Sequence, residues 1–256
     1  VDLDAIVQLA GTASPVTAPE LPLPPRWDAA PAGRPPPAGP TTPDGGQAPP
    51  PTDQPGRPPV VALAGGPAFS FTYPELPEAL LAAGAEVVSF DPRHDPALPP
   101  EATALIAGGG FPEVFAAELA ANQPLLADVR RRVGAGVPTW AECGGLLWLA
   151  RSLDGAALAG VVPADGRMTD RLTLGYRSAM ARVASPIGPA GTRLQGHEFR
   201  YSTLDPPGDA LELNGRSGRT VTGWATPTLF ASYLHVHPAG EPAAVAAFAR
   251  AAGGAP

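Results

Sequence analysis

The sequence predicts an α/β fold, in which a mostly parallel sheet is flanked by helices and gains antiparallel strands in the C-terminal half. Two patterns predict it. From residue 60 to residue 150, short apolar runs alternate with segments of helical periodicity, the pattern of βαβ units with parallel strands. After residue 151 the chain becomes rich in β-forming residues between Gly, Pro and Asp, which is typical of shorter strands joined by turns.

The first half carries a signal for each of its elements. Apolar runs predict four strands, at residues 60–63, 86–90, 103–107 and 137–141. Helical periodicity predicts three helices, at residues 75–83, 112–121 and 125–133. We expect Gly84 and Gly134 to end the first and the third of these helices, because glycine adopts the left-handed capping conformation without strain. Parallel strands present their carboxyl ends at one edge of the sheet, so we expect the site there.

The second half is expected to extend the same sheet. Short β-rich segments predict five strands, at residues 172–183, 192–201, 211–213, 220–224 and 229–234. A closing helix is predicted for residues 241–252. We expect some of these later strands to run antiparallel.

The N-terminal part differs in composition from the rest. Residues 1–10 have the spacing of a short amphipathic helix. Residues 11–59 are rich in Pro, Ala, Gly and Thr, and such a segment buries too little apolar surface to offset its ordering entropy. We therefore expect a disordered linker at 11–59, followed by one folded domain at 60–256.

Composition excludes several classes of partner. A pI near 5.0 and a formal charge of −7 argue against nucleic acid and anionic membranes, which attract basic surfaces. No apolar run is long enough to cross a bilayer. One cysteine excludes an internal disulfide and fits a cytoplasmic setting. All 17 basic residues are arginine, so a P-loop, which requires lysine, is absent from this chain.

The single cysteine, Cys143, lies in the run Pro-Thr-Trp-Ala-Glu-Cys-Gly-Gly, between an apolar strand and a helical segment. This is the pattern of a nucleophile elbow, a sharp strand-to-helix turn that exposes its central side chain at the edge of a sheet. The N-terminus of the following helix is expected to favour the thiolate. The alternative is a buried structural cysteine without chemistry.

A cysteine nucleophile needs a general base. His235 and His237 lie at the end of a strand-like run, and residues two apart in an extended segment share a side. Both imidazoles could therefore face Cys143. For His237 alone, simple packing or the capping of a carbonyl group is an equally good interpretation.

The nucleophile also needs donors for the developing oxyanion. The backbone N–H of Gly144 is one candidate, and Gly109 and Gly110, in the glycine run after the third strand, are the others. Glycines at a strand end let the backbone approach a ligand closely, although such a run is also compatible with a plain tight turn.

Five ordered motifs resemble those of a known family. The segment 60–252 resembles the C-terminal amidotransferase domain of the cobyrinate and hydrogenobyrinate a,c-diamide synthases. The motifs are Ala-Gly-Gly-Gly-Phe-Pro-Glu at 107–113, Ala-Glu-Cys-Gly-Gly at 141–145, Arg-Met-Thr-Asp-Arg at 167–171 with Leu-Gly-Tyr-Arg at 174–177, Gly-His-Glu-Phe-Arg-Tyr-Ser at 196–202, and Ser-Tyr-Leu-His-Val-His at 232–237.

The resemblance implies a class I glutamine amidotransferase fold, which is flavodoxin-like, with Cys143 as nucleophile and His235 as base. In that family the cysteine attacks the side-chain amide of glutamine, ammonia leaves, and water hydrolyses the thioester. A synthetase domain then uses ATP and Mg²⁺ to amidate the a and c acetate side chains of a corrinoid precursor. Residues 1–10 look like the last helix of that domain, so ATP and Mg²⁺ are expected on the missing domain and no cofactor on this chain.

The resemblance leaves the orienting residue of the base open. Many class I relatives carry Glu two positions after the histidine, where this chain carries His237. A neutral imidazole can accept a hydrogen bond there, but it stabilises the His235 imidazolium less than a carboxylate does. We expect Glu142 to hydrogen-bond neighbouring backbone rather than act as a base, because adjacent residues on a sharp turn diverge.

A polar group in the second half suits substrate carboxylates or the contact with the synthetase domain. Solvated surface charge, with the histidine satisfied locally, is the alternative. Its members are Arg167, Asp170, Arg171, Arg177, His197 and Arg200.

Two rival functions remain open from the sequence. The first is a non-catalytic module that keeps the fold and only docks on a synthetase, which the missing Glu after His235 motivates. The second is a metal-dependent hydrolase that uses His197, His235 and His237. No carboxylate-histidine helix motif accompanies these histidines, which disfavours a metal site.

Overall fold

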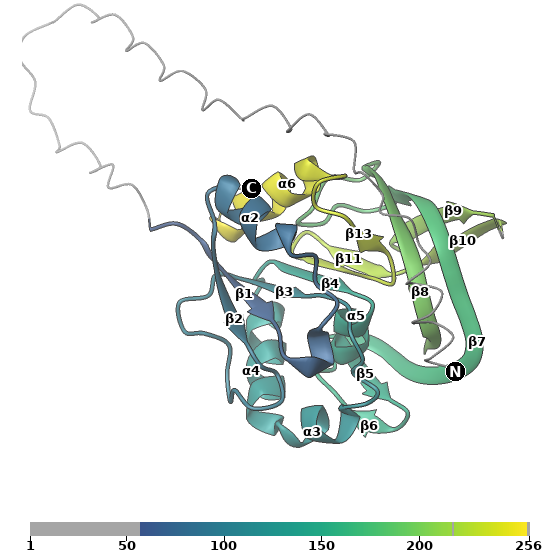
Figure 1. The fold of residues 1–256 in the computed structure, drawn as a ribbon, viewed down its shortest axis with the longest axis horizontal. Helices are drawn as coiled ribbons and strands as arrows, with labels where there is room; N and C mark the ends of the chain where they lie inside the picture. The colour runs from purple at the N-terminus through teal and green to yellow at the C-terminus, as the bar shows by residue number, and fades with distance from the viewer. Residues whose placement is uncertain (1–56, 217, 255–256) are drawn as a thin grey trace, which may run out of the picture. The chain divides into compact units, whose positions relative to one another are not determined.

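The computed structural model describes residues 57–216 and 218–254. The helix predicted for residues 1–10 lies outside the described residues, and so does the predicted linker apart from residues 57–59. The described chain forms two β-sheets, with helices packed against the first one (Figure 1).

Six strands form the first sheet, in the order β11-β12-β4-β3-β1-β2. All of them run parallel except β11, which is antiparallel to β12. β1 and β3 are buried along their whole length, which explains their unbroken apolar runs, because helices cover both faces of the sheet. The bounds are Val60–Ala64 for β1, Glu86–Phe90 for β2, Ala104–Ala107 for β3, Thr139–Glu142 for β4, Trp224–Thr226 for β11 and Leu229–Ser232 for β12. The four strands predicted in the first half are therefore confirmed.

Helices cover the two faces of this sheet. Figure 1 shows α2 and α6 together on one side and α3 and α4 on the other. Leu80 of α2 and Phe248 of α6 belong to the same core as Ile106 of β3, whereas Leu126 of α4 packs with Leu105. Neighbouring residues of one strand thus pack into cores on opposite faces of the sheet, because successive side chains of a strand alternate in direction. The bounds are Pro67–Phe69 for the 3-10 helix η1, Glu75–Ala82 for α2, Ala116–Ala121 for α3, Gln123–Gly134 for α4, Gly144–Leu149 for α5 and Pro242–Ala252 for α6.

The two predicted helix ends are confirmed in position, but the left-handed conformation is confirmed only at Gly84, and one predicted helix start is wrong. Gly84 follows α2 with φ 87°, in the left-handed conformation that was predicted. Gly134 is instead the last residue of α4, and the left-handed glycine is Gly136, with φ 93°. The helix that was expected to start at residue 112 begins only at Ala116, because residues 112–115 form a turn.

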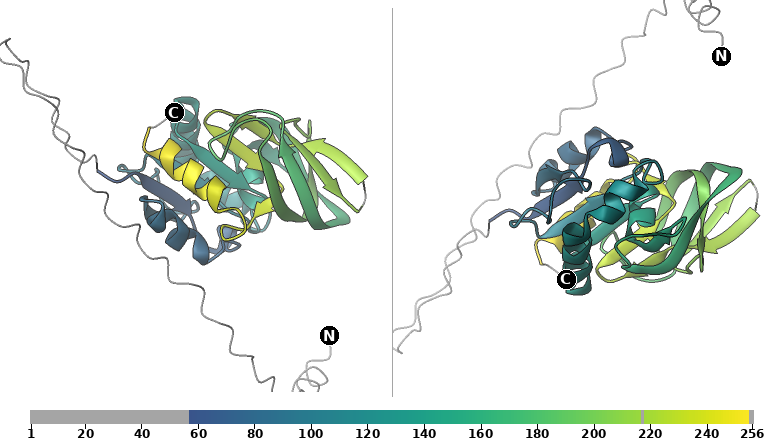
Figure 2. Two further views of the ribbon diagram at one scale, coloured as in Figure 1. Left: turned by 90° about the horizontal axis from the view of Figure 1, so that it is seen from above. Right: turned by 90° about the horizontal axis from the view of Figure 1, so that it is seen from below.

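Most of the later strands form a second sheet instead of extending the first. Its strands follow the order β10-β9-β7-β5-β6, and β8 pairs with both β7 and β13. Figure 2 shows its long strands beside the first sheet. A central parallel strand must be apolar on both faces, whereas β7 alternates buried and exposed residues at both of its ends. The bounds are Ala150–Leu153 for β5, Ala156–Ala157 for β6, Val162–Ala181 for β7, Arg193–Asp205 for β8, Leu211–Gly215 for β9, Gly218–Thr222 for β10 and His235–Val236 for β13.

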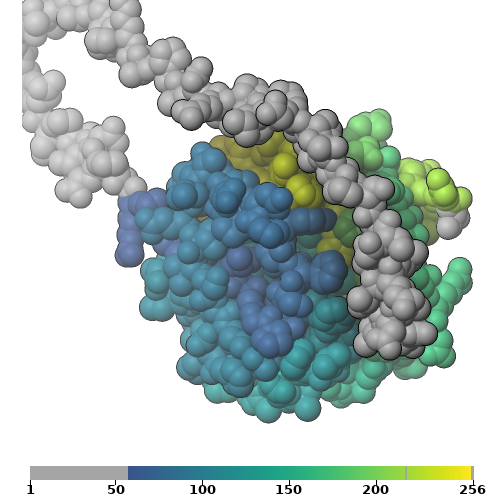
Figure 3. Space-filling view, in the orientation of Figure 1, coloured from purple at the N-terminus to yellow at the C-terminus, as the bar shows by residue number. Residues whose placement is uncertain are grey.

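The long β7–β8 pair and the segment after β1 frame the carboxyl edge of the first sheet. β7 and β8 pair antiparallel, with an irregularity between Met168 and Thr173. Figure 3 shows the dark blue segment that follows β1 at the molecular surface, and Phe71 on this segment is 56% exposed. Phe71 pairs with Gly109 in an isolated antiparallel bridge, which closes this segment over the end of β3.

Candidate active site

Cys143 occupies a strained turn between β4 and α5. Its backbone has φ 48° and ψ −100°, and it is one of two non-glycine residues with positive φ in the described chain. Such a conformation costs on the order of 1–3 kcal/mol and persists only where the surrounding structure enforces it. Hydrogen bonds hold both sides of the turn, from Cys143 N–H to Ser232 O (2.8 Å) and from Gly145 N–H to Gly108 O (2.9 Å). The predicted nucleophile elbow is confirmed as a conformation.

The two glycines after Cys143 let the elbow pack directly on the glycine run that follows β3. A Cβ on Gly144 would lie 2.8 Å from the backbone N of Gly110. A Cβ on Gly145 would lie 2.0 Å from Ala107 O, far inside van der Waals contact. No other residue type fits at position 145 without moving backbone.

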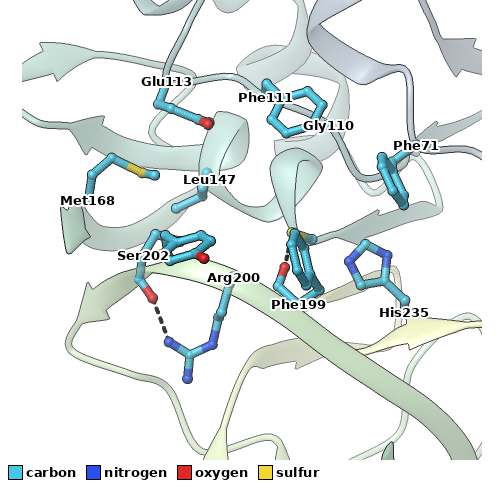
Figure 4. A pocket seen from close by; sticks show the side chains of 12 residues that line it. Phe71, Gly110, Phe111, Glu113, Leu147, Met168, Phe199, Arg200, Ser202 and His235 are labelled. Carbon is cyan, nitrogen blue, oxygen red and sulfur yellow. Dashed lines mark hydrogen bonds between the residues drawn. The ribbon is translucent and has the colours of Figure 1, made fainter. Parts of the chain in front are cut away.

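His235 and Cys143 line the same cavity. His235 lies on β13, opposite His197 of β8, and their rings stack with centroids 4.8 Å apart. A Cβ on Gly109 would lie 2.6 Å from the ring carbon Cε1 of His235, so glycine is required for the imidazole to sit here. Figure 4 shows His235 at the cavity next to Phe199 and Phe71.

The thiol and the imidazole are both neutral in this site. Burial, with smaller contributions from Glu142 and Glu113, raises the pKa of Cys143 to about 12, although the N–H of Gly144 lowers it. Cys143 Sγ lies 3.6 Å from the carbonyl oxygen of Phe199, to which it donates. Burial also lowers the pKa of His235 to about 4, with a smaller contribution from His197. The predicted thiolate is therefore not the resting form, because burial outweighs the dipole of the six-residue helix α5.

The carboxyl group of Glu142 lies near the ring nitrogen Nδ1 of His235. Its Oε2 lies 3.8 Å from His235 Nδ1, and its Oε1 accepts from Trp140 Nε1–H (2.9 Å) and Val236 N–H (3.1 Å). Burial raises the pKa of Glu142 to about 8, although both hydrogen bonds lower it. The expected hydrogen bond to neighbouring backbone is confirmed. The sequence did not predict that Glu142 would face His235. The signal that could have indicated it is a carboxylate at the end of a strand that is buried along its whole length.

His237 does not face Cys143. Its ring packs on Tyr73, with centroids 4.4 Å apart, and its Nδ1 accepts from Ala239 N–H (3.2 Å). The expectation that both histidines share a side fails because β13 ends at Val236. Beyond that residue the chain turns toward α6, and His237 O accepts the N–H groups of residues 240 and 241.

Two of the three candidate oxyanion donors lie at the site without a backbone acceptor among the residues described. Gly144 N–H donates toward the thiol, and Gly110 lines the cavity without a hydrogen-bond acceptor for its N–H among the residues described. Gly109 differs from the expectation, because its N–H donates to Phe71 O (3.1 Å) and its carbonyl accepts from Phe71 N–H (3.0 Å). Gly110 and Gly144 therefore stay candidates, while Gly109 is already engaged.

The buried members of the predicted polar group pair with one carboxylate. Arg177 Nε lies 2.7 Å from Glu198 Oε2, and Arg200 Nε lies 3.2 Å from Glu198 Oε1. Arg200 also lies over the ring of Tyr233, 4.3 Å from its centroid. The Arg177–Glu198 pair joins β7 to β8, whereas Arg200 and Glu198 both lie on β8. Both arginines are therefore already paired with a carboxylate inside the protein.

The remaining members of that group are dispersed. Arg167, Asp170 and Arg171 lie exposed on β7. His197 is half-buried against His235, and burial lowers its pKa. Arg167 and Arg171 are therefore the arginines of this group that are most accessible to substrate carboxylates or to a synthetase domain. Such a contact stays a prediction.

A metal-based interpretation finds no support in residues 57–216 and 218–254. No group of three or more His, Cys, Asp or Glu side chains in this range is placed to hold a metal ion. His197 and His235 stack face to face, while His237 lies against Tyr73. In the same range no helix has the length and apolar character needed to span a membrane.

The fold and the elbow together define a protein with the class I glutamine amidotransferase fold. The structure of PurLQS from Thermotoga maritima superposes with a TM-score of 0.54 at 13% identity, over 74% of this chain and 97% of that one. A GMP synthase subunit protein from Thermoplasma acidophilum superposes with a TM-score of 0.53 at 14% identity, over 77% of this chain and 95% of that one. Similarity at this level of identity concerns the fold alone.

The chain belongs to the family of the CobB/CobQ-like glutamine amidotransferase domain, which matches residues 60–243. It is 44% identical to the hydrogenobyrinate a,c-diamide synthase of Streptomyces coelicolor, over 94% of this chain and 51% of that protein. It is 48% identical to the enzyme of the same name from Thermobifida fusca, over 75% and 42%. The cobyrinate a,c-diamide synthase of Syntrophotalea carbinolica is 42% identical, over 75% and 45%. The chain thus spans about half the length of these relatives.

Proposed function

We propose that this chain hydrolyses glutamine to glutamate and ammonia through a thioester on Cys143. The observation that carries the proposal is the strained elbow, which places Cys143 in one cavity with His235. Family membership supports the substrate, since the family is defined as a glutamine amidotransferase domain.

The neutral resting state sets the order of the proton transfers. As Sγ of Cys143 attacks the amide carbon, its proton passes to Nε2 of His235, since Nδ1 faces Glu142. The N–H groups of Gly110 and Gly144 hold the oxyanion. The tetrahedral intermediate collapses as the C–N bond breaks, and His235 returns its proton to the leaving nitrogen, which departs as ammonia. Water then attacks the thioester with His235 again as base, releasing glutamate and the thiol.

Glu142 is the orienting partner of His235 in this mechanism. Burial keeps the Glu142 carboxyl mainly protonated at rest. The imidazolium that forms on His235 during each proton transfer favours the ionised carboxylate, which in turn stabilises that positive charge. Trp140 Nε1–H and Val236 N–H fix the carboxylate from its other oxygen. A buried carboxylate beside Nδ1 thus takes the role that the sequence motif left to position 237.

We further propose that the ammonia is used by an ATP-dependent synthetase domain, with hydrogenobyrinate or cobyrinate as acceptor. The relatives that carry these names are about twice as long as this chain, which leaves room for such a domain. The chain contains no lysine, so the P-loop and its Mg²⁺ belong to that domain. The names of these relatives support the a and c acetate side chains as the proposed sites of amidation.

A second candidate, a module with little activity of its own, is favoured by one observation. The high pKa of the buried thiol disfavours attack in the free domain. A glutamine analogue with an electrophilic diazoketone in place of the amide distinguishes the proposed enzyme from such a module. Mass spectrometry should find one adduct on Cys143 in the full chain and none in Cys143→Ala. Glutamine hydrolysis that survives in Cys143→Ala, or an unlabelled thiol even with the synthetase domain present, would contradict the proposed enzyme.

A further inference from the structure

The cavity around Cys143 contains a carboxylate that the proposed steps do not use. Glu113 lines this cavity and lies in the turn between β3 and α3. Figure 4 shows its carboxyl group reaching into the space bordered by Phe111, Leu147 and Met168. The loop that supplies Gly110 thus also supplies a charged group to the same cavity.

Glu113 has no cationic partner within the described part of the chain. It forms no ion pair and no side-chain hydrogen bond with another residue there, and only its own backbone N–H donates to it. Its side chain is half-buried. Burial raises its pKa, and the neighbouring charge of Asp154 raises it further. A partly desolvated carboxylate in this setting is stabilised by a cation.

The other charged residue of the cavity is already bound. Arg200 contacts Glu198, donates to Ser202 O and lies over the ring of Tyr233. Figure 4 shows its guanidinium group turned away from Glu113. The end of the cavity near Glu113 is therefore negative, while Cys143 and His235 at the reacting end are neutral.

We propose that Glu113 binds the α-ammonium group of the amino-acid substrate, an inference that rests on the proposed hydrolysis of glutamine. Glutamine carries its reacting amide and its ammonium group at opposite ends, and the cavity offers the thiol for one and a carboxylate for the other. Glu113 also raises the pKa of the Cys143 thiol. An ammonium group at Glu113 offsets that charge, so the substrate itself makes the thiol easier to ionise.

The test compares two substrates on matched variants of the full chain. Glutaramate is glutamine without its α-amino group. The parent protein should prefer glutamine over glutaramate in kcat/KM on the order of 10- to 100-fold, the range of a charge-assisted contact. In Glu113→Gln this preference should fall toward 1, mainly through a higher KM for glutamine. Glu113→Asp, which keeps the charge on a shorter side chain, should recover part of it.

Glu118→Gln is the matched control. Glu118 lies on α3, is exposed and pairs with Arg93 outside the cavity, so its removal should leave the preference unchanged. A Glu113→Gln protein that is folded by circular dichroism and keeps the full preference for glutamine overturns the inference. Binding of glutamine and glutaramate to Cys143→Ala, measured by calorimetry, gives a readout that needs no turnover.

The two proposals fail in different ways. Binding that favours glutamine and depends on Glu113, without hydrolysis by the parent protein or labelling of Cys143, contradicts the proposed reaction and keeps the ammonium site. Hydrolysis with equal use of both substrates contradicts the ammonium site alone. If Cys143→Ala binds neither compound, the ammonium site is also wrong.

Discussion

Oε2 of Glu142 lies 3.8 Å from Nδ1 of His235, although the two residues are far apart in the sequence. β4 ends at Glu142, and Cys143 follows directly, in the strained turn that leads into α5. One strand end thus supplies both the proposed nucleophile and the carboxyl group that faces its proposed base. In the proposed mechanism, this arrangement gives a chain without Glu two positions after His235 a carboxyl group in that role.

Glu142→Gln should lower kcat at least tenfold and leave KM for glutamine nearly unchanged. The amide keeps the shape of the side chain, but it cannot stabilise the imidazolium by charge. Steady-state kinetics on the protein paired with its synthetase domain measures both constants. A fall that appears in KM alone would assign Glu142 to substrate binding instead.

Substitutions of the two histidines in the C-terminal motif should have very different effects on kcat. His235→Asn removes the proposed base and should reduce kcat by on the order of 10²- to 10⁴-fold. His237→Asn should stay within about threefold, because its ring contacts Tyr73 away from the cavity. Equal losses in the two variants would mean that His237 moves into the site during turnover.

Glu142 should make the folded domain less stable as pH rises from 4.5 to about 8. Its pKa is raised from 4.5 to about 8 by burial, so above pH 4.5 the unfolded chain releases a proton that the folded chain retains. The contribution is complete below pH 4.5 and lost as pH passes about 8. Urea unfolding between pH 5 and pH 8 should therefore show a flatter pH dependence for Glu142→Gln than for the parent.

At lower pH, His235 should have the opposite effect on the stability of the folded domain, which should rise as pH rises. Its folded pKa is lowered from 6.5 to about 4, so its contribution is present above pH 6.5 and lost as pH falls toward 4. His235→Asn measured alongside Glu142→Gln separates the two slopes. If both variants keep the parent's pH dependence, neither group holds the protonation state inferred from its burial.

We expect two glycine substitutions to change the free energy of unfolding in opposite directions. Gly145→Ala places a Cβ 2.0 Å from Ala107 O, and we expect it to destabilise the domain by about 2–4 kcal/mol or to prevent folding. Gly134→Ala meets nothing within 4 Å in α4 and should stabilise by about 0.5–1 kcal/mol. Denaturant unfolding of the two proteins gives both values. A tolerated Gly145→Ala would show that the elbow and the end of β3 can move apart.

The first half of the fold followed from sequence because its signals are local. Burial on both faces leaves an unbroken apolar run such as that of β1, and a glycine such as Gly84 marks a left-handed helix cap. The later strands could not be assigned to a sheet, because alternating burial predicts a strand and not its neighbour. His237 was misplaced for a related reason, since the period of two holds only while the strand continues.

The sequence by itself determined that a cysteine follows a buried strand, that glycines flank it, and that a histidine motif stands near the C-terminal end of the chain. These are properties of neighbours in the chain, and each has a local physical cause. Only the tertiary structure decided that Glu142 faces His235, that Glu113 enters the cavity, and that burial keeps the Cys143 thiol protonated. Distance, desolvation and charge act between residues brought together by folding, and sequence order does not specify them.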